Sequence, residues 1–295
     1  DLHLSIRRQR QMCIRDRACR HPSWNRTSNG SPCSMIDIGA NLTNSAFTDD
    51  LTDVLDRAKR EGVRHIVVTG TSVHESQRAI ALATVHAPYL SATVGVHPHD
   101  ADDVQPGWLD TLEGLTSSSC VVALGEMGLD YYRDYSKRDA QRQVFEAQLD
   151  LAARLELPVF VHDRNTKGEV LALLRRYKPG KCVVHCFTGN SDELDGFIAQ
   201  DFYIGITGWI CDERRNDELR RIVGRIPLDR LLVETDAPYL LPRNLSKVVA
   251  NRRNEPGHLK FIIAEVARCR RCPEDVIRDA TVENACRLFG IALAA

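Results

Sequence analysis

Short apolar runs alternate with longer amphipathic segments along the chain from Met35 onward. Eight of these runs hold five or six residues, are rich in Val, Ile and Leu, and are apolar on both faces, which predicts strands buried in a parallel sheet. They cover residues 36–40, 64–69, 91–96, 120–124, 158–162, 181–185, 202–206 and 230–234. Helical periodicity predicts helices at residues 49–61, 74–86, 107–117, 137–156, 168–176, 191–200, 214–224, 256–269 and 273–289.

The predicted strands and helices form eight consecutive pairs within residues 35–295. This alternation over about 250 residues is typical of an α/β protein with the (β/α)8 TIM-barrel fold. A doubly wound open sheet is the alternative, but no Gly-x-Gly-x-x-Gly loop, which often marks that fold, follows the first strand. No repeat or linker interrupts the pattern, so we expect one domain over residues 35–295.

Residues 1–34 lack the periodicity of a strand or a helix. They hold seven arginines, no lysine and two aspartates, whereas the rest of the chain is acidic. Arginine-rich segments with few acids are typical of organelle targeting peptides, but this one has no clear amphipathic stripe. We therefore expect residues 1–34 to be an extension outside the domain, read through from upstream of a start at Met35, with a targeting segment as the alternative.

The overall composition is that of an ordinary globular protein. Hydrophobic residues make up 43% and charged residues 27% of the 295 positions, which excludes a wholly disordered or fibrous chain. No uncharged apolar run approaches the roughly 18 residues of a membrane span, so we expect no membrane association. The ten cysteines are scattered and no secretory signal precedes them, which favours a reduced, cytoplasmic protein. We expect a monomer without an obligate protein partner.

Ionisable side chains gather at the carboxyl ends of the predicted strands, where the active sites of such barrels lie. Burying a charge is costly unless it is paired or bound to a metal, so imidazoles and carboxylates that converge on one rim predict a divalent metal site. Mixed nitrogen and oxygen donors suit zinc, manganese or, more weakly, magnesium. The predicted ligands, which end or follow strands four, five, six and eight, are Glu126, His162, His185 and Asp236.

Eight motifs carry a resemblance to a known family. They are Ile36-Asp-Ile-Gly-Ala-Asn-Leu-Thr43, Gly95-Val-His-Pro-His99, Gly125-Glu-Met-Gly-Leu-Asp130, His162, His185-Cys-Phe-Thr-Gly189, residues 203–215, Glu234-Thr-Asp-Ala-Pro-Tyr239 and Arg252-Arg-Asn-Glu-Pro256. Together they resemble the TatD family of metal-dependent deoxyribonucleases, which belongs to the amidohydrolase superfamily. The resemblance implies a 3′–5′ exonuclease acting on single-stranded DNA, with RNA left open, and a role in DNA repair or degradation. It also implies a divalent cation, for which we expect Mg²⁺, with Mn²⁺ or Zn²⁺ as alternatives.

The first strand departs from the superfamily pattern. Most members of the superfamily open with a His-x-His pair that binds the first metal, and the corresponding positions here are Gly39 and Asn41. Glycine has no side chain to offer, and Asn is a weak oxygen ligand. Cytosolic TatD proteins resemble this chain in lacking the pair, so the departure does not imply an inactive enzyme. It leaves open whether one or two ions bind.

The resemblance also implies roles for the rim residues. Glu126, His162 and His185 would hold one ion and leave coordination positions for water and substrate. Asp236 would orient or deprotonate the attacking water, as the strand-eight Asp does in related barrels. His97 and His99 would contact the phosphate or protonate the leaving oxygen. For these two histidines, a structural turn bracketed by Pro98 is the alternative.

The loops on the same side of the barrel hold candidates for binding the substrate. An acidic domain is not expected to coat long nucleic acid through bulk charge, so we expect two or three specific phosphate contacts. The candidates are Arg133, Arg164, Arg214, Arg215, Arg252 and Arg253. Aromatic side chains that stack unpaired bases are the second requirement of a single-strand binder. We expect Tyr131, Tyr132 and Trp209 in that role, with packing of the barrel as the alternative for Trp209.

Two other functions remain open from the sequence. The same metal site would serve an amidohydrolase acting on a small amide or ester, although such enzymes often have a metal-ligating Lys and no predicted strand ends in Lys. A non-catalytic barrel that binds nucleic acid is the other alternative, and the complete set of ionisable rim residues speaks against it. Metal-dependent release of nucleotides distinguishes all three.

Overall fold

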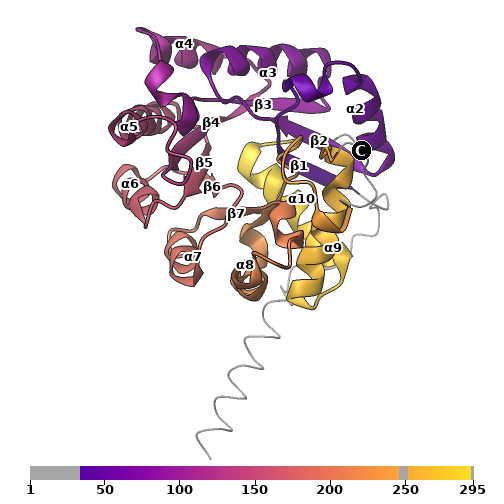
Figure 1. Ribbon diagram of the computed structural model, residues 1–295. Helices are drawn as coiled ribbons and strands as arrows, with labels where there is room; N and C mark the ends of the chain where they lie inside the picture. The colour runs from indigo at the N-terminus through magenta and orange to yellow at the C-terminus, as the bar shows by residue number, and fades with distance from the viewer. Residues whose placement is uncertain (1–33, 246–251, 294–295) are drawn as a thin grey trace, which may run out of the picture.

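Eight parallel strands form the centre of the molecule, and helices surround them (Figure 1). The computed structural model describes residues 34–245 and 252–293. Each strand pairs with its neighbour in sequence order, and Ala40 at the end of the first strand bridges to Ala237 beyond the last. The amides of Asn41 and Asp236 donate hydrogen bonds of 2.7 Å and 2.8 Å to the carbonyls of Ala237 and Gly39, which join the two edges. The predicted (β/α)8 barrel is confirmed.

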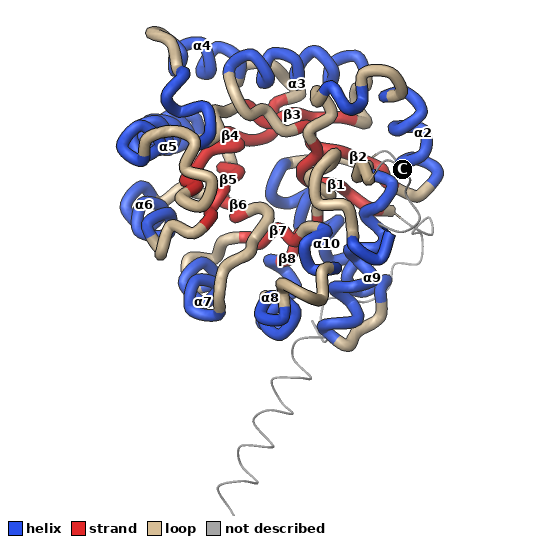
Figure 2. Tube along the Cα trace, viewed as in Figure 1, coloured by secondary structure: helices blue, strands red, loops and turns tan. Residues whose placement is uncertain are grey.

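The strands and helices alternate as the pattern predicts (Figure 2). The strands are β1 (Met35–Ala40), β2 (Val63–Val68), β3 (Leu90–Val94), β4 (Val121–Asp130), β5 (Val159–Arg164), β6 (Cys182–Val184), β7 (Tyr203–Ile206) and β8 (Leu231–Val233). The helices are α2 (Leu51–Arg60), α3 (Val73–Val85), α4 (Trp108–Leu115), α5 (Arg138–Leu155), α6 (Glu169–Tyr177), α7 (Ser191–Ile198), α8 (Asp217–Ile222), α9 (Leu259–Arg270) and α10 (Glu274–Phe289).

The largest difference from the predicted bounds lies in β4, which continues to Asp130 instead of ending at residue 124. The pairing of β4 with β5 shifts register between Leu124 and Met127. Gly125, with a φ of +137°, lies at this irregularity, and a Cβ there would meet the carbonyl oxygen of Phe160 at 2.2 Å. Because this irregularity interrupts the apolar pattern, the sequence predicts that the strand ends at residue 124, although β4 continues to Asp130. Glu126 therefore lies within β4, not after it.

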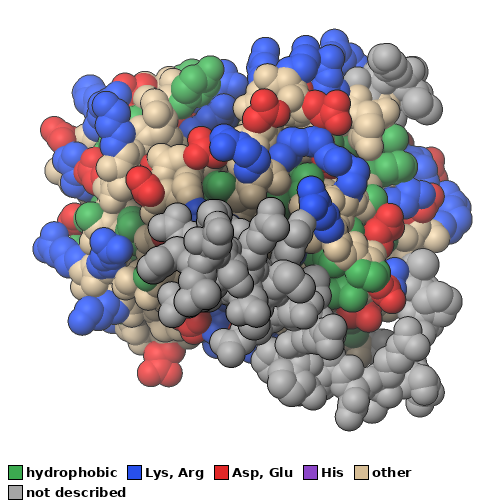
Figure 3. Space-filling view, turned by 90° about the horizontal axis from the view of Figure 1, so that it is seen from below, with side chains coloured by type: hydrophobic (Ala, Val, Ile, Leu, Met, Phe, Trp, Pro, Cys, Tyr) green, Lys and Arg blue, Asp and Glu red, His purple; other side chains and the backbone are tan. Residues whose placement is uncertain are grey.

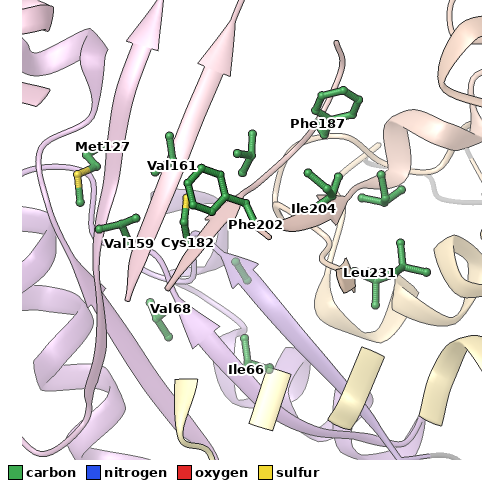
Figure 4. Packing of buried hydrophobic residues seen from close by; sticks show 14 of the residues in the cluster. Ile66, Val68, Met127, Val159, Val161, Cys182, Phe187, Phe202, Ile204 and Leu231 are labelled. Atoms are coloured by element: carbon green, nitrogen blue, oxygen red, sulfur yellow. The ribbon is translucent and has the colours of Figure 1, made fainter. Parts of the chain in front are cut away.

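Apolar side chains fill both the interior of the barrel and the layer between strands and helices. Residues such as Ile38, Phe160 and Leu232 form the inner cluster, to which α10 contributes Leu288 and Phe289. The outer cluster includes Ile66, Val68, Met127, Val159, Val161, Cys182, Ile204 and Leu231, which are drawn in Figure 4. Because every strand is covered on both faces, the strands are apolar on both faces, as parallel strands usually are.

The expectation for residues 1–34 concerns a segment that, apart from Ser34, lies outside the described residues. Within the described ranges, no helix combines the length and the apolarity that crossing a bilayer requires.

Candidate active site

A cavity of about 800 Å³ opens at the carboxyl ends of the strands. All eight strands, or the loops that follow them directly, supply side chains to its wall. They include Asn41 after β1, Thr71 after β2, His97 and His99 after β3, Glu126 and Asp130 in β4, His162 and Arg164 in β5, His185 after β6, Trp209 after β7 and Asp236 after β8. Every catalytic and metal residue predicted from the sequence therefore lines this cavity.

Three imidazoles converge on one oxygen of Glu126. Its Oε1 lies 2.7 Å from Nε2 of His185, 3.0 Å from Nδ1 of His162 and 3.1 Å from Nε2 of His97. All four residues come from consecutive strands or strand ends, β3 to β6, which brings them to one point of the rim. Although burial disfavours the anion, the charges of His185 and His97 hold the pKa of Glu126 well below its usual value.

A second carboxylate, Asp130 at the end of β4, contacts His99 and shares His162 with Glu126. Its Oδ2 lies 2.8 Å from Nε2 of His99 and 3.4 Å from Nε2 of His162. Its Oδ1 accepts hydrogen bonds from the backbone amides of Tyr132 and Arg133. Burial opposes ionisation, yet the contacts with His162 and His99, together with the hydrogen bond from the backbone amide of Arg133, hold the pKa of Asp130 below its usual value. Asp130 thus fixes the His99 ring and the loop that follows β4.

Asp236 completes the cavity wall beside β1. Its Oδ1 accepts a hydrogen bond of 2.9 Å from the side-chain amide of Asn41. Burial, helped by the charges of Glu126 and Glu234, raises the pKa of Asp236 to about 7, whereas His185 and Asn41 act in the opposite direction. A carboxyl group with a pKa near neutrality is suited to exchange a proton at physiological pH.

These residues suit a divalent cation. The donor atoms of His97, Glu126 and His162 all lie within 4.8 Å of one another. Nε2 of His162 is buried and makes no hydrogen bond in the described part of the chain, because Oδ2 of Asp130, 3.4 Å away, does not meet hydrogen-bond geometry, although a buried polar atom normally has a partner. Imidazole nitrogen and carboxylate oxygen together form a donor set that binds zinc or manganese readily. His97, predicted as a catalytic residue, belongs to this compact set.

The six arginines predicted to bind phosphate lie in different places. Arg133 and Arg164 line the cavity, while Arg214 and Arg252 line a smaller neighbouring cavity that Trp209 borders as well. Arg215 lines neither of these two cavities. Arg253 pairs with Asp50 at 2.7 Å, and Arg214 pairs with Asp212 at 3.1 Å. Basic and acidic side chains are likewise interspersed on the face of the molecule that Figure 3 shows.

The aromatic candidates also separate. Trp209 is half-buried and borders both cavities, whereas Tyr131 donates to Oε2 of Glu169 and Tyr132 lies under the Arg164 guanidinium, 4.6 Å from its Cζ. The cavity wall instead holds two exposed tyrosines, Tyr135 and Tyr239, with exposed fractions of 67% and 53%. Neither residue has a role in the predictions from the sequence. Tyr135 follows the motif Gly125–Asp130, and Tyr239 is the last residue of the motif Glu234–Tyr239, so their proximity to these motifs was the available signal.

Asp130, Glu234 and Arg78 likewise have no role in the predictions from the sequence. The first two were part of the quoted motifs, and each stands beside a predicted ligand histidine in the structure. Arg78 reaches the cavity from α3, where it donates to the carbonyl of Thr43 at 2.7 Å. A helix residue carries no strand-end signal, which explains why the pattern did not reveal it.

Comparison with known proteins agrees with the expected resemblance. The family model described as TatD related DNase matches residues 36–290. The chain is 47% identical to a 3′-5′ ssDNA/RNA exonuclease TatD of Pectobacterium atrosepticum over 260 residues, which are 88% of this chain and 100% of that protein. It is 48% identical to the protein of the same name from Citrobacter koseri, again over 88% of this chain and 100% of that protein.

A solved structure supports the same assignment. The crystal structure of YjjV, a TatD homologue from Escherichia coli K12, superimposes with a TM-score of 0.82 and 31% identity, covering 88% of this chain and 99% of that one. The sequence match and the structural match both extend over the barrel and its rim. The chain therefore belongs to the TatD related DNase family.

Proposed function

We propose that this protein is a metal-dependent 3′–5′ exonuclease that hydrolyses phosphodiester bonds of single-stranded DNA, with RNA as a second substrate. The observation that carries the proposal is the convergence of His97, His162 and His185 on one oxygen of Glu126 within the cavity. The names of relatives that are 47% and 48% identical support the reaction, its direction and its substrates.

The proposed ligands of the cation are Glu126, His162, His185 and Asp236, joined by His97 because of its position beside Glu126. When bound, a divalent cation supplies Lewis-acid polarisation of a phosphoryl oxygen and lowers the pKa of water. We propose Mg²⁺ as the ion used in the cell. Mn²⁺ and Zn²⁺ are the alternatives, since the imidazole nitrogens accept both.

Other groups of the chain would position and protonate the reactants. Asp236, held by Asn41, is the proposed base that orients and deprotonates the attacking water. His97 and His99 are proposed to contact the phosphate or to protonate the leaving oxygen. The Asp130 carboxylate, which binds Nε2 of His99, orients that ring.

A single strand suits the cavity better than a duplex does. The histidine cluster is formed by buried strand-end residues, and a frayed end reaches such a depth more readily than an internal bond of a duplex. Tyr135 and Tyr239 at the wall offer rings on which unpaired bases stack. Arg133 and Arg164 offer contacts to phosphates at the same wall.

The alternatives have weaker support. None of the described residues that line the cavity is a lysine, which disfavours an amidohydrolase with a ligating Lys. The intact donor set disfavours a barrel that only binds nucleic acid. We propose that the enzyme acts as a cytoplasmic monomer in DNA repair or degradation.

The test uses the protein stripped of metal and then supplied with Mg²⁺. Labelled single-stranded DNA should be degraded only after Mg²⁺ is returned, and Glu126→Gln, His162→Ala or His185→Ala should abolish that stimulation while the circular dichroism spectrum is unchanged. His74→Ala, which removes an exposed histidine of α3, is the control and should behave as the wild type. Full activity of refilled His185→Ala would refute the assignment.

A further inference from the structure

Glu234 is a fully buried carboxylate directly after β8, with an exposed fraction of 0%. Two glycines of the neighbouring strands make room for it. A Cβ at Gly39 in β1 would lie 2.5 Å from Oε2 of Glu234, and a Cβ at Gly205 in β7 would lie 2.9 Å from Oε1. Both distances are too short for real side chains, so the Glu234 carboxylate occupies space that any other residue at position 39 would claim.

The two oxygens of this carboxylate have different surroundings. Oε1 accepts a hydrogen bond of 2.6 Å from the backbone amide of Cys186. Oε2 has no hydrogen-bond partner in the described part of the chain, but Nδ1 of His185 lies 3.4 Å from it. The other nitrogen of the same ring, Nε2, lies 2.7 Å from Oε1 of Glu126. His185 is therefore held between two buried carboxylates, one on each ring nitrogen.

We propose that Glu234 is a positioning residue for His185, an inference that rests on the proposed metal centre. The Glu234 carboxylate accepts a hydrogen bond from the Nδ1–H of His185, which leaves the Nε2 lone pair directed at the Glu126 cluster, where the cation would bind. The proton stays on Nδ1 throughout. Carboxylates that bind the remote nitrogen of a metal-ligating histidine fix its tautomer and orientation, and their loss typically weakens metal binding by about 10- to 100-fold.

Gly39 is the second half of the same arrangement. Because even a methyl group at this position would meet Oε2 of Glu234, the glycine is required for the carboxylate to lie beside His185. The lack of a side chain at position 39 of β1 therefore leaves the space that the Glu234 carboxylate, directly after β8, occupies. An uncharged but larger residue at position 39 is therefore expected to displace Glu234, disturb the orientation of His185 and so weaken metal binding.

The first experiment measures Mn²⁺ affinity of the full chain without nucleic acid, from the electron paramagnetic resonance signal of free Mn²⁺. Glu234→Gln, which keeps the shape but not the charge, should weaken Mn²⁺ binding by about 10- to 100-fold. Gly39→Ala should weaken it similarly. Gly114→Ala, at a site in α4 with nothing within 4 Å of the added Cβ, should bind as the wild type. Wild-type affinity in Glu234→Gln, or a wild type that binds no Mn²⁺, would overturn the proposal.

A second measurement reads the protonation of the His185 ring in the wild-type protein. In wild-type protein with ¹⁵N-labelled histidine and bound Zn²⁺, the ring of His185 should carry its proton on Nδ1, with its signals identified by their loss in His185→Gln. A ring protonated on Nε2 would overturn the proposal. Glu234→Gln should also lower kcat for DNA with little change in KM. A chain that shows the Mn²⁺ and tautomer results but cleaves no nucleic acid would refute the proposed function and leave this inference standing.

Discussion

Asn41 donates a hydrogen bond of 2.9 Å from its side-chain amide to Oδ1 of Asp236. This bond crosses the seam between the first and last strands, where the backbones of Gly39 and Asp236 are also joined. Asn41 occupies a position at which the sequence predicts at most a weak oxygen ligand. In the structure its nitrogen side faces the carboxylate, so the amide holds Asp236 in place.

Removing this amide should impair turnover more than binding. In Asn41→Ala, Asp236 loses the partner that fixes its orientation, and a hydrogen bond to a charged group is worth about 1.5–3 kcal/mol. We expect kcat for single-stranded DNA to fall by about 10-fold or more, with KM nearly unchanged. Steady-state kinetics with Mg²⁺ measure both. A rise in KM at constant kcat would instead place Asn41 in substrate binding.

Tyr135 and Tyr239 should contribute to binding through stacking. Removal of an aromatic ring that stacks on a base costs about 1–3 kcal/mol, so Tyr135→Ala and Tyr239→Ala should each raise KM for single-stranded DNA by about 5-fold or more. Tyr135→Phe and Tyr239→Phe should retain most of the affinity. The comparison variant is Tyr132→Ala, an exposed tyrosine outside the cavity wall, which should have the smaller effect. A larger increase in KM for Tyr132→Ala than for Tyr135→Ala and Tyr239→Ala would favour stacking on Tyr132, as the sequence predicts.

The N-terminal segment should be dispensable. Residues 1–34 have no core-forming pattern, so a chain that begins at Met35 should match the full chain in melting temperature and in exonuclease rate. Thermal unfolding monitored by circular dichroism measures the first. A decrease of more than about 3 °C, of order 1 kcal/mol for a domain of this size, would show that the segment packs against the barrel.

His65 should make the stability depend on pH. It is buried in β2 beside Ser91, and burial lowers the pKa of His65 to about 4. The unfolded chain therefore takes up a proton near pH 6.5 that the folded chain takes up only near pH 4, so stability falls as the pH decreases through this window. Relative to His65→Gln, the wild type should lose about 3 kcal/mol more unfolding free energy between pH 7 and pH 4. Denaturant titrations measure the free energy of unfolding at each pH. The same change in this free energy between pH 7 and pH 4 for the wild type and His65→Gln would contradict the prediction.

Much of the fold follows from local pattern. Runs such as residues 64–69 and 202–206 are apolar on both faces, and their alternation with helices leaves few architectures. The convergence of Glu126, His162, His185 and Asp236 on one cavity could be predicted because parallel strands bring their carboxyl ends to one rim. The position of Glu126 within β4 could not, since the register shift around Gly125 arises in the pairing of β4 with β5, which the local pattern does not contain.

Pairings between distant residues could not be predicted either. Asn41 and Asp236 are 195 positions apart and meet only because the barrel closes. Arg253 was a candidate for phosphate binding, but its pairing with Asp50 depends on how the chain after β8 returns to α2. Glu234 resembles any other strand-end carboxylate in the sequence, and only the space left by Gly39 and Gly205 reveals its place beside His185.

The most direct test of the proposed activity follows a 5′-labelled single-stranded DNA in the presence of Mg²⁺. The account predicts a ladder of products that shorten one nucleotide at a time from the 3′ end, no reaction when a bulky group blocks that end, and much slower cleavage of a blunt duplex. Chelation of the metal should stop the reaction. Cleavage of a covalently closed single-stranded circle at the same rate would identify an endonuclease and contradict the account.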